Sequence, residues 1–191
     1  MSRSVSAFEG LNVLDISDRL SGAFAARFFG DFGADVLLAE PPGGHCLRHE
    51  MPVSECSNTG DSDAGCVSPL HAYANWNKRS AAFVDVSDLQ PLVAAADLII
   101  CTRLETADIV GTWLRADAVL LVVTPHGATG SLAEFPGNNL TASARTGWSY
   151  INRLRNEPPL QMPRYQSGYV GGIAGFIAAS SALLRLSLIH I

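Results

Sequence analysis

The chain has 191 residues, which is enough for one domain with a hydrophobic core and short for two. Hydrophobic residues make up 48% of it and charged residues only 16%, a composition that excludes a disordered chain and favours a buried parallel sheet. The net charge of -5 argues against a protein that binds nucleic acid or an anionic membrane surface. An anionic ligand would therefore need local cations.

No export signal is visible in residues 1–10, which contain one arginine and no apolar segment of signal-peptide length. We therefore expect a cytoplasmic protein whose four cysteines are free thiols. Residues 165–184 carry no charge, but they are crowded with Gly, Ser and Ala. We expect a buried helix there and no membrane span.

The first forty residues have the pattern of a βαβ unit. A short apolar run is followed by a turn region, by small and aromatic residues at helical spacing, and by a second apolar run that a Pro-Gly segment ends. In chain order, the pattern predicts a strand at 12–16, a turn at 17–22, a helix at 23–32 closed by Gly33, and a strand at 34–39. The Pro-Gly segment 40–44 ends this second strand.

The remaining elements continue the alternation of strands and helices. After a long surface loop at 45–65, the sequence predicts strands at 81–85, 98–101 and 119–123, a helix at 88–96, and a buried helix at 168–186 whose small residues permit close approach. Such a pattern indicates an α/β fold: a Rossmann-like parallel sheet with helices on both faces. We expect one domain at 1–186, incomplete at its end, and a truncated end or non-native tail at 187–191.

Four blocks of sequence, in register, resemble the family III CoA-transferases. This family includes formyl-CoA transferase, carnitine CoA-transferase and α-methylacyl-CoA racemase. The resemblance covers nearly the whole chain, and its most specific part is the first block. The blocks are 10–44, then 77–80, then 96–100 with Arg103, and finally 129–147.

The resemblance implies the N-terminal half of an enzyme that moves CoA between carboxylic acids. CoA or acyl-CoA would be a substrate, and no permanently bound cofactor is expected. The family builds dimers of interlocked chains, so we expect a homodimer or pairing with a second CoA-transferase half. A binder of CoA needs positioned cations and backbone N–H groups for its phosphates.

Open α/β sheets bind ligands at the carboxyl ends of their strands, which is here called the sheet-edge rule. This rule and the resemblance together indicate the candidate CoA contacts. Lys78 and Arg79 precede a predicted strand, where the alternative is a solvated pair without a ligand. Arg103 follows a strand end, although Glu105 brings a carboxylate where phosphate is expected. His126 lies at the same edge, with a structural role as its alternative. The full set is Arg19, Ser21, Lys78, Arg79, Cys101, Thr102, Arg103 and His126.

The family mechanism needs an aspartate that attacks an acyl-CoA thioester and forms a mixed anhydride, then an aspartyl-CoA thioester. Counting back from Gly147 places that aspartate at Asn139, whose amide lacks the anionic oxygen of a nucleophile. A helix N-cap is the alternative role of Asn138 and Asn139. The racemase branch uses a histidine and an aspartate as acid and base, but Asn138 and Gly168 occupy those positions.

Two other kinds of site are disfavoured. A nicotinamide dehydrogenase needs Gly-x-Gly-x-x-Gly after its first strand, and residues 17–22 contain a single glycine. Five potential zinc ligands share one loop, but their spacings fit no zinc pattern, so no metal site is expected. These ligands are His45, Cys46, His49, Cys56 and Cys66.

Two hypotheses follow from the sequence. In the first, the chain is half of a CoA-transferase whose active site belongs to a larger protein. In the second, which Asn139 favours, it is a catalytically silent CoA-binding or dimerisation module.

Overall fold

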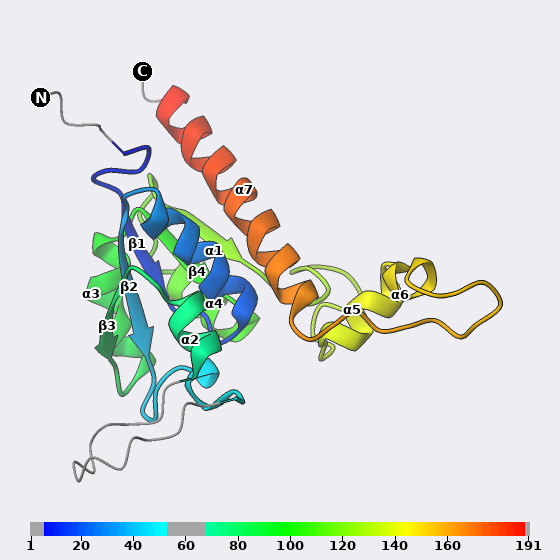
Figure 1. Ribbon diagram of the computed structural model, residues 1–191. Coiled ribbons are helices and arrows are strands. Elements are labelled where there is room, and N and C mark those ends of the chain that lie inside the picture. Colours follow the sequence, from blue (N-terminus) through cyan, green and yellow to red (C-terminus); the bar gives the residue numbers. More distant parts are fainter. Residues whose placement is uncertain (1–5, 53–67, 190–191) are drawn as a thin grey trace, which may run out of the picture.

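The structure is a computed structural model that describes residues 6–52 and 68–189. Its centre is a five-stranded, fully parallel sheet with the strand order β3-β2-β1-β4-β5 (Figure 1). The sheet confirms the predicted α/β class. Its strands are β1 (Asn12–Asp15), β2 (Asp35–Glu40), β3 (Lys78–Ala82), β4 (Leu98–Cys101) and β5 (Val119–Val122).

The strand order creates a crevice at the carboxyl edge of the sheet. The chain runs outward from β1 to β3 and then crosses back to β4 on the other side of β1. The connections that leave β1 and β4 therefore diverge to opposite faces. Open parallel sheets bind ligands at such a switch point.

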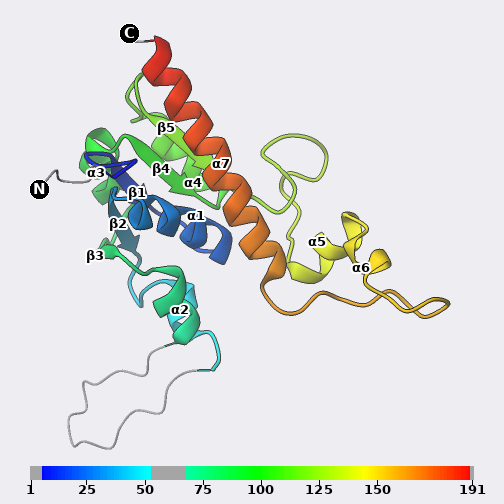
Figure 2. The same ribbon diagram turned by 45° about the horizontal axis from the view of Figure 1, so that its top comes forward.

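Helices cover both faces of the sheet, as the sequence predicts. On one face, α1 and α7 pack over Val13, Val36 and Ile100; on the other, α3 and α4 pack over Leu14 and Ile99 (Figures 1 and 2). The α-helices are α1 (Leu20–Asp31), α2 (Pro69–Ala74), α3 (Gln90–Ala95), α4 (Leu104–Gly111), α5 (Asn139–Arg145), α6 (Trp148–Ile151) and α7 (Gln166–Ile189). Short 3-10 helices form at Cys46–His49 and Val86–Leu89.

Several boundaries differ from the prediction. The strand expected at 81–85 is β3, which begins at Lys78 and ends at Ala82. Cys46–His49 is helical within the predicted loop 45–65, and residues 53–67, with Cys56 and Cys66, lie outside the described residues. The helix predicted at 168–186 is longer in the structure, because α7 begins at Gln166 and continues to Ile189, into the stretch 187–191 that is expected from the sequence to be a tail.

Glycines allow α7 to approach α1 closely. A Cβ atom on Gly172 would lie 2.9 Å from the carbonyl oxygen of Ser21 and 3.0 Å from the Cβ of Phe24. One on Gly168 would lie 3.1 Å from the Leu20 side chain. This confirms the predicted role of the small residues in helix packing.

The helix that the sequence predicts to be buried is buried only where it faces α1 and the sheet, and the outer side of α7 is apolar and exposed. Ile177 and Leu184 are 58% and 62% exposed. Among the described residues, the stretch Gln166–Ser187 is the one helix that meets the length and composition of a membrane span.

An arm, residues 152–165, connects α6 to α7 and projects away from the sheet (Figures 1 and 2). Its return limb is held to α6 by a hydrogen bond from the Leu160 N–H to the Ser149 carbonyl, at 3.1 Å. The arm thus folds back on itself and delivers the chain to the start of α7.

Candidate functional site

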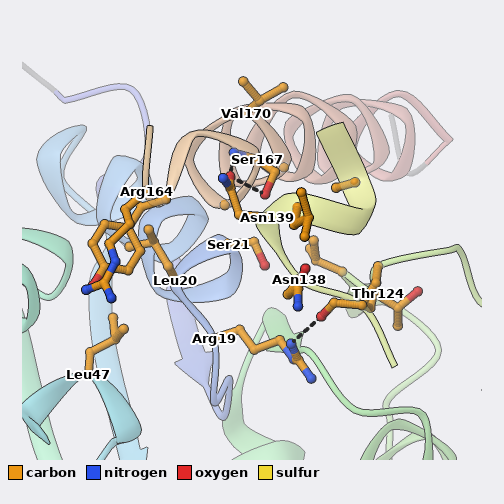
Figure 3. A pocket seen from close by; sticks show the side chains of 18 of the residues that line it. Arg19, Leu20, Ser21, Leu47, Thr124, Asn138, Asn139, Arg164, Ser167 and Val170 are labelled. Carbon is orange, nitrogen blue, oxygen red and sulfur yellow. Dashed lines mark hydrogen bonds between the residues drawn. The ribbon is translucent and has the colours of Figure 1, made fainter. Parts of the chain in front are cut away.

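A cavity of about 960 Å³ lies at the carboxyl edge of the sheet, where the sheet-edge rule places ligands. It is formed by the β1–α1 connection, the Cys46–His49 helix, the segment after β5, the starts of α5 and α7, and the end of the arm (Figure 3). Its lining includes Asp18, Arg19, Ser21, Cys46, Leu47, Glu50, Thr124, Asn138, Asn139, Arg164, Tyr165, Ser167 and Gly168.

Arg19 is a cation available to a ligand in this cavity. Its guanidinium donates to the carbonyl oxygen of Gly137 at 3.2 Å, and it forms no ion pair with any described residue. The neighbouring Asp18 carboxylate already accepts from Thr102 Oγ1 at 2.6 Å and from Arg103 Nε at 2.5 Å. Burial would raise the pKa of Asp18, but these contacts outweigh it and hold the pKa below its ordinary value. Arg19 therefore keeps a free charge beside a carboxylate that is satisfied elsewhere.

The other predicted contacts around β4 support the cavity from behind. Thr102 and Arg103 hold Asp18, and Cys101 is buried, with its thiol donating to the Arg103 carbonyl at 3.1 Å. His126 is half-buried behind Gly137 and does not line the cavity; its Nε2 lies 3.4 Å from the Pro136 carbonyl oxygen. Of the predicted contacts, the structure brings Arg19 and Ser21 into the cavity itself.

Lys78 and Arg79 do not reach the cavity. The ammonium group of Lys78 is buried and donates to Asp15 Oδ2 at 2.7 Å, to Asn75 Oδ1 at 2.7 Å and to the Ala23 carbonyl at 2.8 Å. All three N–H groups are used, so none is left for a phosphate. Arg79 is exposed and pairs with Asp35, the first residue of β2, at the opposite edge of the sheet.

Asn138 and Asn139 have different roles at the start of α5. Asn138 is the N-cap, as the alternative prediction has it: its side chain accepts from the Thr141 N–H at 3.1 Å, and its own N–H donates to Thr141 Oγ1. The side chain of Asn139 points to the start of α7 (Figure 3). Its Oδ1 accepts from the N–H and from the hydroxyl of Ser167, both at 2.9 Å. Gly168 lines the same cavity, so the positions compared with the transferase and racemase groups lie together.

Several lining groups are not among the sequence candidates. Arg164 is brought to the cavity by the return of the arm. Glu50 accepts from the hydroxyl of Tyr165 at 3.0 Å.

Cys46 also lines the cavity. Burial raises the pKa of the Cys46 thiol to about 11, so this cysteine is protonated at neutral pH. In the part of the chain that the structure describes, no three metal-ligating side chains come together.

The comparisons with known proteins agree on one family. Residues 8–187 match the model of CoA-transferase family III. The chain is 31% identical over 174 residues to a subunit of succinyl-CoA:(R)-benzylsuccinate CoA-transferase from Thauera aromatica, covering 84% of this chain and 40% of that protein. It is 24% identical over 197 residues to human succinyl-CoA:glutarate CoA-transferase, covering 95% of this chain and 42% of that enzyme.

Solved structures show the same fold. A CAIB/BAIF family protein from Brucella suis matches with a TM-score of 0.85 and 21% identity, covering 98% of this chain and 51% of that one. The chain thus spans about two fifths of the length of these curated relatives and about half of this structure.

Proposed function

Because this chain belongs to CoA-transferase family III, we propose that its cavity binds CoA or acyl-CoA as part of a protein that moves CoA between carboxylic acids. The observation that carries the proposal is Arg19, a guanidinium without an ion pair among the described residues, placed in a large cavity at the ligand edge of the sheet. Apolar side chains such as Leu20 and Val123 also line this space and suit the uncharged arm of CoA.

Positive charge in the cavity would select the anionic groups of CoA or of the substrate acid. Arg19 would hold a phosphate or a substrate carboxylate by charge-assisted hydrogen bonds. Arg103 is 64% exposed at the same edge, but its ion pair with Asp18 offsets its charge. The chain as a whole has a net charge of -5, so the arginines that line the cavity, Arg19 and Arg164, would decide where an anion binds.

The chemical step requires a carboxylate. In covalent CoA transfer, an enzyme carboxylate attacks the thioester carbonyl and expels CoA as a thiolate, leaving a mixed anhydride; the thiolate then attacks the enzyme acyl carbon and releases the donor acid. Two carboxylates occur among the described lining residues, Asp18 and Glu50, and both accept hydrogen bonds from neighbouring side chains.

A second candidate function is a silent CoA-binding module that supports an active copy or a second half. The amide of Asn139 favours it, because this side chain lines the cavity and lacks an anionic oxygen. A relative described as a subunit, that of the Thauera enzyme, is consistent with a division of labour between chains.

Titration calorimetry with CoA and with succinyl-CoA tests the binding proposal. We expect Arg19→Gln to weaken binding by about tenfold or more, because a charge-assisted hydrogen bond is lost. Arg79→Gln is the matched control: it also removes one arginine, but at the opposite edge of the sheet, and should leave the affinity unchanged. Equal affinities for the two variants, or no binding to the folded native chain, would refute the proposal.

Isotope exchange separates the two functions. An active transferase exchanges labelled succinate into succinyl-CoA, whereas a silent module binds CoA without exchange. The assay should be run on the native chain alone and with any co-purifying partner.

A further inference from the structure

We propose that Asn139 is a positioning residue whose amide group clasps α5 to the start of α7, and that the surrounding backbone requires an amide at this position rather than a carboxylate. The clasp comprises Asn139, Ser167 and the carbonyl groups of Met162 and Pro163. Two of its residues, Asn139 and Ser167, line the cavity at the base of the arm.

The Asn139 side chain has hydrogen-bond acceptors around its nitrogen and hydrogen-bond donors around its oxygen. Its Nδ2 donates to the carbonyl oxygens of Met162 at 3.2 Å and of Pro163 at 3.3 Å. Its Oδ1 accepts from the N–H and the hydroxyl of Ser167. Carbonyl oxygens can only accept and a backbone N–H can only donate, so the orientation of the amide is fixed by its neighbours.

A carboxylate fits only half of this environment. One oxygen of an aspartate could still accept from Ser167, but the other would face two carbonyl oxygens with no hydrogen to share. That arrangement loses two hydrogen bonds and adds repulsion between partial and full negative charges. Protonation would remove the charge and supply one donor, so the pKa of an aspartate at this position should be raised and the damage should fade at low pH.

The clasp connects segments that form facing walls of the cavity. Asn139 is the first residue of α5, and its own carbonyl accepts from Ser143 Oγ at 2.7 Å within that helix. Ser167 is in the first turn of α7, next to Gly168, and both line the cavity. Loss of the clasp should therefore widen the cavity and weaken ligand binding. Asn139 would then hold the site together, and replacing it would not reveal a dormant nucleophile.

Asn139→Asp and Asn138→Asp form a matched pair for the test. Both add one negative charge at the start of α5, but Asn138 is the N-cap, where aspartate caps as well as asparagine and a carboxylate is favoured by the helix dipole. At pH 7 we expect Asn139→Asp to lower the melting temperature by several degrees and to weaken CoA binding by about fivefold. Both losses should shrink as the pH falls to about 5. Asn138→Asp should keep the native melting temperature throughout; it is a control for stability alone, because Asn138 also lines the cavity.

Two further variants secure the test. Asn139→Ala should lose stability by a similar amount but show no recovery at pH 5, since alanine does not titrate. Ser167→Ala removes only the hydroxyl partner, so it should fold with a smaller loss even if Asn139→Asp does not, and its effect should largely disappear in the Asn139→Ala background.

Three results would overturn the proposal. They are a native melting temperature for Asn139→Asp at pH 7, a loss in that variant that does not change with pH, and a hydroxylamine-sensitive acyl-enzyme that it forms from acyl-CoA. The stability measurements stand whether or not the native chain binds CoA, so failure of the clasp is distinguishable from failure of the proposed function.

Discussion

Lys78 and Asp15 form an ion pair in the interior of the protein, with side chains 1% and 0% exposed and 2.7 Å between Nζ and Oδ2. The second carboxylate oxygen of Asp15 accepts from the Ser17 N–H at 2.9 Å. Lys78 also holds the carbonyl of Ala23, in the first turns of α1. The pair therefore fixes both ends of the β1–α1 connection, from which Asp18 and Arg19 enter the cavity.

Removing the cation of this pair should be costly. Lys78→Met leaves the Asp15 carboxylate buried without its partner, so we expect a loss of about 3–5 kcal/mol in the free energy of unfolding. Arg79, the residue after Lys78, forms an exposed ion pair with Asp35, so Arg79→Met should cost less than about 1 kcal/mol of unfolding free energy. Urea denaturation at pH 7 measures both. Similar losses in the two variants would contradict the buried role of Lys78.

The stability of the protein should fall between pH 6.5 and about pH 4 because of His71. Burial, followed by the charge of Arg48, lowers the pKa of His71 from 6.5 to about 4, against the opposing effect of Glu40. Below pH 6.5 the unfolded chain binds a proton at this histidine that the folded chain does not, so stability decreases until the folded pKa is reached. His71→Gln should reduce this decrease, as measured by the urea midpoint at each pH. The exposed His49 provides the control: if His49→Gln flattens the profile equally, the assignment to His71 fails.

Cys46 should react slowly with alkylating reagents although it lies at the cavity surface. Its thiol donates to the Asp18 carbonyl at 2.6 Å, and burial raises its pKa from 9.0 to about 11. The thiolate is the reactive form, so iodoacetamide at pH 8 should modify Cys46 about a hundredfold more slowly than a thiol with the ordinary pKa. Peptide-level mass spectrometry over time gives the rate. Modification as fast as that of free cysteine would show that the thiol is not held in this way.

Neighbouring glycines of α7 should respond in opposite ways to one added methyl group. A Cβ at Gly172 meets backbone and Cβ atoms of α1 at 2.9 and 3.0 Å, so Gly172→Ala should cost about 1–3 kcal/mol. A Cβ at Gly171 has its nearest neighbour at 3.4 Å, so Gly171→Ala should gain up to about 1 kcal/mol from helix propensity. Thermal melts of the two variants make the comparison. Destabilisation of both to the same degree would mean that α7 sits differently on α1.

The strands that the sequence predicts well are those with continuous apolar runs. β4 is buried at every position, and its run of Leu, Ile, Ile and Cys marks both ends. β3 reads Lys-Arg-Ser-Ala-Ala and is mostly exposed at the edge of the sheet, so its pattern carries no such signal and the prediction began three residues late. The same misplacement made Lys78 look like a loop cation instead of a buried one.

From its strand pattern, the sequence predicts only those lining residues of the cavity that lie close to the end of a strand along the chain. Arg19 and Ser21 follow β1 directly, so the sheet-edge rule and the resemblance both indicate them. Arg164 reaches the cavity through the return of the arm, which no local pattern reveals. The hydrogen bonds of Asn139 likewise join residues more than twenty positions apart.

The arm is tied at its base by the contacts of Asn139 and, further out, by the bond between Leu160 and Ser149. Beyond these ties, the tip near residues 153–158 is joined to itself by short-range bonds such as that from Glu157 to Leu154. The cost of closing a loop rises only slowly with its length. The tip is therefore a permissive place for an inserted epitope or fluorophore, and a protease nick there should leave two fragments that remain associated and still enclose the cavity.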